Sequence, residues 1–514
     1  MLLGLDLGTT NVKALVTIDS GGVVAQGSCP IQLFHVGDAG VEQDLEEIWT
    51  ATLSAIREAV RGINPGDIRA IGVSSQGGAM QVLNPLGKPL GRVISWLDKR
   101  GRPHDNTLTV ELGRNWFVQR VGHRCSGLAI GQLQRLRQES PCWLAPPNRI
   151  GFVGDSIVAR LCGRAAHDGT SGGLTLLYNP ARRVYDPDLL QRLSIRGDQL
   201  PDLISPQVAA GSVSVELARV TGLSAGIPVS AAVHDQYAAA LGAGAVHSGT
   251  TMVGTGTAWV LLAISDQQQK PVCDNAFVCH HVIEGLHGQI VSLANGGSAL
   301  GWALGLMGLG ASTPAQIEQL LASAPAGSEG LSFWPFLTPG GAAGLLPGTK
   351  GRWSGLQLSH RPAHVARTVV EGLAFELKRH LLFLRRAGVP VKNLLMGGAA
   401  AAGRVTPQIL ADVTGLPVGC SGTGASSLLG AAILARGLIE PRKSLAALAD
   451  DMVPRARQVR PGSDAALYAA RFAEYLASLP LEQPGSEILR ALKVRRAGRK
   501  ARPARLRPED AKSK

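Results

Sequence analysis

The strongest constraint on the fold is a hairpin pattern that occurs twice in the chain. Residues 4–15 are GLDLGTTNVKAL, in which leucines alternate with small or polar residues, as in a strand, until the chain turns at Gly8. Residues 250–264 repeat this pattern around a Gly-Thr-Gly-Thr turn that begins at Gly254. The two turns are 246 residues apart, and each opens one half of the chain. We interpret the halves as duplicated domains facing each other across a cleft; two unrelated hairpins in a glycine-rich chain are the alternative.

The first hairpin carries a lone carboxylate, Asp6, among leucines and a hydroxyl-rich turn after it. Turn amides and Thr hydroxyls can donate to phosphate oxygens, and a nearby carboxylate can hold Mg²⁺. The pattern therefore indicates a phosphate-and-magnesium site. The alternative is that Asp6 is a solvated face residue and that Gly8 only permits the turn.

The length of the chain, 514 residues, exceeds what one hydrophobic core supports. We expect two domains of similar size, at 1–241 and 242–480. Apolar periodicity predicts helices at 41–60, 365–388 and 406–415, and strands at 68–76 and 393–398. This alternation of strands and helices predicts an α/β fold with crossover helices. The sequence has no complete GxGxxG and no GxxxxGK[ST], so neither a dinucleotide fold nor a P-loop is indicated.

Most of the net charge of +13 lies near the end of the chain. Residues 490–514 contain eleven Lys or Arg and two Asp or Glu, a net +9, which leaves +4 for everything before them. We therefore predict a basic disordered tail at 481–514 on a nearly balanced body. With aromatic residues at 4%, no specific nucleic-acid partner is expected.

The cysteine pattern and the hydrophobic stretches predict a cytoplasmic protein. Seven scattered cysteines without a C-x-x-C pair favour a reducing compartment. The first strand begins at residue 2, which leaves no room for a signal peptide. The uncharged stretch 289–316 is long enough to span a membrane, but Asn295 and several glycines favour a buried, tightly packed helix. No membrane partner is expected, and the oligomeric state stays open, with a homodimer as one alternative.

Several segments, taken in their order along the chain, carry a family resemblance. They are GLDLGTTNVKAL, AIGVSSQ followed by GKPLGRVISWLDKRG, VHDQYAAALGAG, VGTGTAWV, ANGGSALGW, and LLMGGAAAAGRVTPQILADVTGLPV followed by LLGAAILA. They resemble the FGGY family of carbohydrate kinases, members of the actin-like ATPase superfamily, with xylulokinase as the most similar kind. The resemblance covers about residues 1–480. It implies two ribonuclease-H-like domains that face each other across a nucleotide and substrate cleft.

The resemblance also implies roles for individual residues, with ATP and Mg²⁺ as cofactors. Asp6 orients Mg²⁺, and Asp235 is the general base that takes the proton of the acceptor hydroxyl. The nucleotide-binding residues are Thr9, Thr10 and Lys13 around the γ-phosphate, Thr255 at the β-phosphate, and Gly297, Gly397 and Gly398. The acceptor-binding residues are Gln76, Gly77, Gly78, Trp96, Arg100 and Gln236. From local sequence alone, Asp235 is alternatively the cap of the helix that follows it, and His234 packs at the end of a strand.

The chain departs from the family at Gly77 and Gly78. Xylulokinases have a Met-His pair here and glycerol kinases an Arg-Glu pair, so two side chains that hold the acceptor are absent. We expect vacated volume at one end of the acceptor pocket. Either an acceptor bulkier than a pentulose fills this volume, or a pentulose binds there loosely. Ala402 also replaces a polar residue common near the adenine.

The predicted function is ATP-dependent phosphorylation of a hydroxyl on a sugar or polyol, with a ketose as the nearest acceptor. A kinase for a different small hydroxylated acceptor is one alternative. A nucleotide-binding regulator without turnover is the other. Two carboxylates retained in a cleft favour chemistry over regulation, because an unused buried charge is costly.

Overall fold

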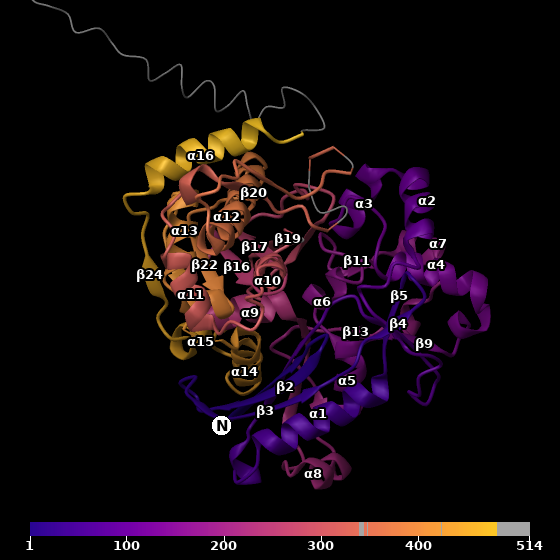
Figure 1. Ribbon diagram of the computed structural model, residues 1–514. Coiled ribbons are helices and arrows are strands. Elements are labelled where there is room, and N and C mark those ends of the chain that lie inside the picture. The colour runs from indigo at the N-terminus through magenta and orange to yellow at the C-terminus, as the bar shows by residue number, and fades with distance from the viewer. Residues whose placement is uncertain (294, 339–343, 347, 423, 481–514) are drawn as a thin grey trace, which may run out of the picture.

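The computed structural model describes residues 1–480 except 294, 339–343, 347 and 423. The tail predicted at 481–514 lies outside the described residues. The described chain forms two lobes, one built from the first half of the sequence and one from the second (Figure 1). Each lobe contains a large mixed sheet with helices against it, as the α/β prediction required.

The first sheet belongs to the N-terminal half, and the described residues give it eight strands. They are β1 (Leu2–Leu7), β2 (Asn11–Thr17), β3 (Val23–Pro30), β6 (Ile71–Ser75), β10 (Ala166–His167), β13 (Asp202–Leu203), β14 (Ala209–Ser212) and β15 (Pro228–His234). Strands β1, β2 and β3 form an antiparallel meander. On the other side, β1 pairs in parallel with β6, which pairs in parallel with β15.

The second sheet belongs to the C-terminal half and has seven strands among the described residues. They are β16 (Thr250–Thr255), β17 (Trp259–Ser265), β18 (Ala276–His280), β19 (His287–Ser292), β22 (Asn393–Gly397), β23 (Val418–Cys420) and β24 (Arg457–Val459). Strands β16, β17 and β19 form an antiparallel meander, and β16 pairs in parallel with β22, which pairs in parallel with β23. This is the arrangement of the first sheet, so the prediction of two similar halves is confirmed.

A third sheet of five described strands extends the N-terminal half. Its strands are β4 (Phe34–Val36), β5 (Gly40–Gln43), β7 (Met80–Leu83), β8 (Val93–Ile94) and β9 (Arg149–Phe152). Two short antiparallel pairs complete the described strands: β11 (Tyr178–Asn179) with β12 (Val184–Tyr185), and β20 (Ser332–Trp334) with β21 (Arg352–Ser354). The third sheet reaches the first hairpin turn, because Gln43 at the end of β5 donates to the backbone carbonyl of Thr9.

Helices cover the sheets, and the three predicted ones are present. The described α-helices are α1 (Leu45–Ala59), α2 (Arg102–Leu112), α3 (Arg114–Val121), α4 (Ala129–Glu139), α5 (Val153–Cys162), α6 (Gly169–Gly173), α7 (Pro187–Arg192), α8 (Val215–Thr221), α9 (Asp235–Ala243), α10 (Gly297–Leu306), α11 (Pro314–Ala322), α12 (Pro362–Arg386), α13 (Val405–Thr414), α14 (Ser426–Ile439), α15 (Leu445–Met452) and α16 (Ala465–Ala477). Helix α1 starts where the carboxylate of Asp44 accepts from the backbone N–H groups of Glu46 and Glu47, which satisfies two donors that the first helical turn leaves free.

One helix of the C-terminal half packs directly on the first sheet. Figure 1 shows α14 beside the strands of the N-terminal hairpin. The approach is so close that a Cβ at Gly4 would lie 2.4 Å from the carbonyl oxygen of Leu428, and one at Gly72 would lie 1.8 Å from that of Ala431. Helix α9 meets α14 in the same way at Gly430, where a Cβ would lie 1.8 Å from a backbone oxygen. Backbone contact through glycine therefore joins the two halves.

The prediction of a buried helix within 289–316 is wrong. The stretch divides between β19, α10 and the start of α11. Helix α10 buries only Ala299, Ala303 and Leu304, while Trp302 is 41% exposed and Leu306 65% exposed. The stretch is interrupted at its glycines: Gly296 and Gly297 begin α10, and Gly308, with φ +72°, follows the end of this helix. Among the described residues, no helix combines the length and the apolar character needed to cross a bilayer.

Replacing Gly72 by Ala should destabilise the protein, because its new Cβ would overlap a backbone oxygen of α14 that cannot rotate away. We expect a loss of about 1–3 kcal/mol, measured from denaturant or thermal unfolding. The matched control is Gly301→Ala in α10, where nothing lies within 4 Å of the new Cβ. This control should gain about 0.5–1 kcal/mol, since Ala is the better helix former. Equal unfolding midpoints for Gly72→Ala and the unmodified protein would contradict a close backbone contact between β6 and α14.

Candidate active site

Three parallel strands bring the two predicted carboxylates to one edge of the first sheet. Strand β6 lies between β1 and β15, and Ser74 of β6 is in register with Asp6 on one side and Val233 on the other. Asp235 follows Val233 by two residues and begins α9. Ligands of such sheets bind beyond the carboxyl ends of the parallel strands. The fold therefore places Asp6 and Asp235 where a ligand would lie.

Asp6 is held by two hydroxyl groups, one from each half of the chain. Ser74 donates to one carboxylate oxygen over 2.8 Å, and Ser427 at the start of α14 donates to the other over 2.7 Å. Burial, followed by the negative charge of Asp235, raises the pKa of Asp6 above its ordinary value. Lys13 is the cross-strand partner of Asp6 and makes no ion pair among the described residues. Its ammonium group is thus free to meet an anionic ligand.

Asp235 has the environment expected of a general base. Burial raises the pKa of its carboxyl to about 6, and hydrogen bonds from Gln236 partly oppose this rise. The Asp235 side chain keeps 30% exposure, so it can reach a ligand, and Nε2 of His234 lies 3.3 Å from its Oδ1. The N-cap of α9 is His234. Asp235 is thus the first residue of the helix rather than its cap, and His234 ends strand β15 as predicted.

The tip of the first hairpin presents free backbone donors. Gly8 donates its backbone N–H to the carbonyl of Asn11 and closes the turn. Among the described residues, the backbone N–H groups of Thr9 and Thr10 donate to no protein acceptor. The Thr10 hydroxyl accepts from the side-chain amide of Asn11 over 3.2 Å, which leaves its own proton available. Two free N–H groups and one hydroxyl proton at a single turn suit a phosphate group.

The predicted nucleotide-side residues also come together, at the tip of the second hairpin. Thr255 donates its hydroxyl proton to the carbonyl oxygen of Gly397 over 2.7 Å. Gly398 adopts φ +94°, which favours glycine, and a Cβ there would lie 2.9 Å from Oγ1 of Thr255. Gly297 begins α10 and donates its N–H to the carbonyl of Gly256 in the hairpin turn. Thr255, Gly297, Gly397 and Gly398 thus lie together around the turn of the second hairpin.

The expectation of vacated volume at Gly77 and Gly78 is wrong. A Cβ at Gly77 would lie 2.5 Å from the ring of His234 and 2.8 Å from Cβ of Leu174, and Gly78 adopts φ +73°. The cavity beside this pair has a volume of only about 10 Å³, the space of one water molecule. The glycines are present because the imidazole of His234 already occupies the space that a longer side chain would fill.

Two predicted acceptor residues are already engaged with other protein groups. The guanidinium of Arg100 pairs with Asp98 and Glu42, each at 2.6 Å. Gln76 is 4% exposed and uses both amide N–H groups on the protein, at the carbonyl of Gly8 and the side chain of Gln43. Arg100 and Gln76 therefore hold together the loops around the predicted acceptor region. Trp96 is 46% exposed and keeps an accessible ring.

Sequence reasoning missed Gln43, Ser74 and Ser427. Ser74 lies inside the segment AIGVSSQ on the predicted acceptor side, and its place in the predicted strand is the signal that could have found it. Gln43 comes directly before the cap of α1, and its amide contacts the first hairpin turn. Ser427 is 421 positions from Asp6, so no local pattern connects the two.

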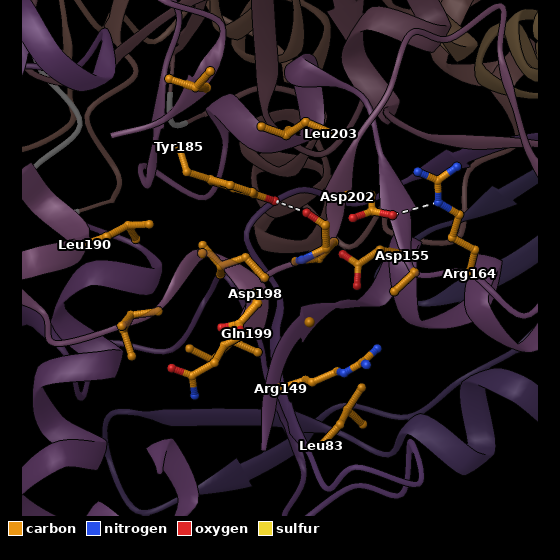
Figure 2. A pocket seen from close by; sticks show the side chains of 18 of the residues that line it. Leu83, Arg149, Asp155, Arg164, Tyr185, Leu190, Asp198, Gln199, Asp202 and Leu203 are labelled. Atoms are coloured by element: carbon orange, nitrogen blue, oxygen red, sulfur yellow. Dashed lines mark hydrogen bonds and ion pairs between the residues drawn. The ribbon is translucent and has the colours of Figure 1, made fainter. Parts of the chain in front are cut away.

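A cavity of about 930 Å³ lies elsewhere in the N-terminal half, and none of the predicted site residues lines it (Figure 2). Several of its polar groups already have protein partners. Arg164 pairs with Asp202 at 2.7 Å, and the hydroxyl of Tyr185 donates to the carbonyl of Pro201 over 2.9 Å. The carboxylates of the candidate site do not face this cavity, so we do not assign the reaction to it.

The two similar hairpins and the two partly enclosed carboxylates agree with comparisons to known proteins. Residues 1–242 match the N-terminal domain of the FGGY family of carbohydrate kinases, and residues 251–436 match its C-terminal domain. The chain belongs to the FGGY family of carbohydrate kinases. This FGGY protein is thus a phosphotransferase with an alcohol group as acceptor.

Similar proteins include kinases for different acceptors. The chain is 28% identical to a xylulose kinase of Escherichia coli, over 87% of this chain and 91% of the relative. It is 30% identical to a glycerol kinase of Citrifermentans bemidjiense, over 84% of this chain and 89% of the relative. The solved xylulose kinase of Lactobacillus acidophilus superposes with a TM-score of 0.85 at 23% identity, covering 96% and 98% of the two chains. The FGGY protein has their two-domain, actin-like ATPase fold.

Gly77→Ala should impair turnover, because the added methyl group would displace the ring of His234 beside Asp235. We expect kcat to fall about tenfold, which corresponds to about 1.4 kcal/mol of lost transition-state stabilisation. The same substitution in a His234→Ala background should cost less, because the ring it collides with is gone. Steady-state kinetics of the four proteins give both costs. Equal costs in the two backgrounds would show that Gly77 does not act through His234.

Proposed function

We propose that the FGGY protein transfers the γ-phosphoryl group of ATP to a hydroxyl of a ketose, with Asp235 as the general base. The observation that carries this proposal is the carboxylate of Asp235, which is enclosed enough to raise its pKa to about 6 yet keeps 30% side-chain exposure beside Asp6. A base whose pKa lies near the working pH is largely ionised and still accepts a proton readily.

The reaction needs little covalent chemistry from the protein. The acceptor oxygen attacks the γ-phosphorus, the bond from that phosphorus to the β-bridging oxygen breaks, and the acceptor proton passes to Asp235. The protein contributes position and charge stabilisation. The ammonium of Lys13 and the free N–H groups of Thr9 and Thr10 supply positive charge and donors for the transferring group.

The donor set at Asp6 fits Mg²⁺. It consists of carboxylate and hydroxyl oxygens, the hard ligands that Mg²⁺ prefers, and within the described part of the chain each Asp6 oxygen accepts one hydrogen bond. Among the described residues no cluster of three or more His, Cys, Asp or Glu could cage a metal. That agrees with a cation held by one or two carboxylates, water and nucleotide phosphates. When bound, Mg²⁺ would neutralise phosphate charge, and Asp6 would hold it while Ser74 and Ser427 orient Asp6.

The choice of a ketose rests on likeness to xylulose kinases across the whole fold and on two accessible groups. Trp96 offers an exposed ring and Gln236 a polar side chain beside Asp235. The comparable identity to a glycerol kinase keeps a different small polyol as the second candidate acceptor. A regulator without turnover is disfavoured because two carboxylates held close together in a partly enclosed site cost stability without serving a ligand.

A panel of ketoses and polyols tests the proposal. ADP release with ATP and Mg²⁺ should depend on the acceptor and be largest with a ketose. Asp235→Asn should lower this rate by about two to four decades while ATP binding and unfolding stay near those of the unmodified protein. Asp38→Asn, at an exposed loop position, is the matched control and should keep full activity. Near-normal turnover of Asp235→Asn would refute the role of Asp235 as base.

The activity should depend on pH through Asp235. Its pKa is about 6 in the folded protein, and only the ionised form accepts a proton. The value of kcat/KM should therefore be level above this pKa and fall tenfold for each further pH unit below it. A profile of kcat/KM from pH 5 to 8 measures this fall. If kcat/KM begins to fall only near pH 4, the ordinary range of an exposed carboxyl, the pKa of Asp235 is not raised in the free enzyme.

A further inference from the structure

Thr9 is the point where the first and third sheets meet. Three side chains contact it or its turn: Gln76 follows β6 of the first sheet, Gln43 ends β5 of the third sheet, and Trp96 follows β8 of the third sheet. Gln43 donates to the backbone carbonyl of Thr9 over 2.9 Å. Trp96 donates its indole N–H to the Thr9 hydroxyl over 3.1 Å. The tip of the phosphate hairpin is thus tied to the acceptor-side segment.

The donors and acceptors of this network have fixed directions. An indole N–H can only donate and a backbone carbonyl can only accept. The Thr9 hydroxyl therefore accepts from Trp96 and gives its single proton to Oε1 of Gln76, 3.3 Å away. The Gln76 amide group in turn donates to the carbonyl of Gly8 over 3.3 Å and to Gln43 over 3.1 Å. The one hydroxyl proton of Thr9 is committed to protein.

The network has a buried end and an accessible end. Gln43 is 0% and Gln76 4% exposed, whereas Trp96 is 46% exposed. Breaking a hydrogen bond at the buried amides would leave a polar group without a partner in a low-dielectric environment, so these amides hold the turn firmly. The ring of Trp96 is the part that a ligand can reach. The Thr9 hydroxyl is where Trp96 contacts the turn.

We propose that Trp96 and Thr9 couple acceptor binding to the position of the phosphate hairpin. An acceptor that packs against the Trp96 ring fixes the indole, and the indole N–H fixes Thr9 at the tip that meets the γ-phosphate. Thr9 is then a positioning residue, and Thr10 is the threonine whose side chain donates to phosphate. The inference rests on the proposed function, because it takes Trp96 as an acceptor contact. Binding of each substrate must favour binding of the other by the same factor.

A double-mutant cycle tests the coupling. Trp96→Phe keeps an aromatic face but removes the N–H, and Thr9→Val keeps the shape but removes the hydroxyl. Each variant should raise KM for the substrate on the opposite side: Thr9→Val for the acceptor and Trp96→Phe for ATP. The expected factor is about three- to tenfold, the size of one net hydrogen bond. In the double variant, KM for each substrate should be no higher than in the single variant with the higher value, because the two substitutions remove the same hydrogen bond.

Two comparisons separate coupling from general damage. Thr9→Ser restores the hydroxyl and should restore both KM values. Thr10→Val should raise KM for ATP and leave KM for the acceptor unchanged, because Thr10 makes no contact with Trp96 in this network. An unaltered acceptor KM in Thr9→Val, or effects that multiply in the double variant, would overturn the coupling while leaving the kinase function in place. A wild-type protein that phosphorylates no acceptor would instead overturn the proposed function, and the coupling with it.

Discussion

The backbone contact of α14 with β1 and β6 is the constraint on which the site depends. Gly4 and Gly72 let a helix of the C-terminal half lie against the first sheet with no side chain between them. The start of that helix carries Ser427, whose hydroxyl reaches Asp6 over 2.7 Å. A larger distance between α14 and the first sheet would move Ser427 away and leave one oxygen of Asp6 without its hydrogen-bond donor. The distance between the halves and the orientation of the carboxylate are therefore set together.

The two carboxylates at this end of the sheet have different surroundings, which suit the separate roles that we propose for them. Burial, followed by the negative charge of Asp235, raises the pKa of Asp6, so a positive charge nearby would stabilise its ionised form. Burial raises the pKa of Asp235 to about 6, and hydrogen bonds from Gln236 only partly oppose this rise. Asp6 receives two hydroxyl donors that favour its charged form. These different surroundings suit the roles that we propose, a metal ligand for Asp6 and a general base for Asp235.

Local sequence patterns predicted the elements and the carboxylates, and they failed where distant residues decide the outcome. Strand-like patterns around Gly-Thr turns located both hairpins, and the position of Asp235 between a strand and a helix indicated the carboxylate that we propose as the base. At Gly77 the sequence suggested an open pocket, because nothing nearby in the chain reveals that His234 fills the space. The exposed face of α10 escaped prediction for a related reason. Hydrophobicity alone does not say whether a neighbouring helix covers that face.

The two hairpins use their threonines in the same way, which limits how phosphate can be bound. Thr9 gives its hydroxyl proton to Gln76, and Thr255 gives its proton to the carbonyl of Gly397. Both hydroxyls therefore fix the shape of a turn. The donors left at the first tip are the backbone N–H groups, the Thr10 hydroxyl and the ammonium of Lys13. Backbone donors held in a rigid turn need no reorganisation as charge develops on the transferring group, which is how a site with little covalent chemistry lowers its barrier.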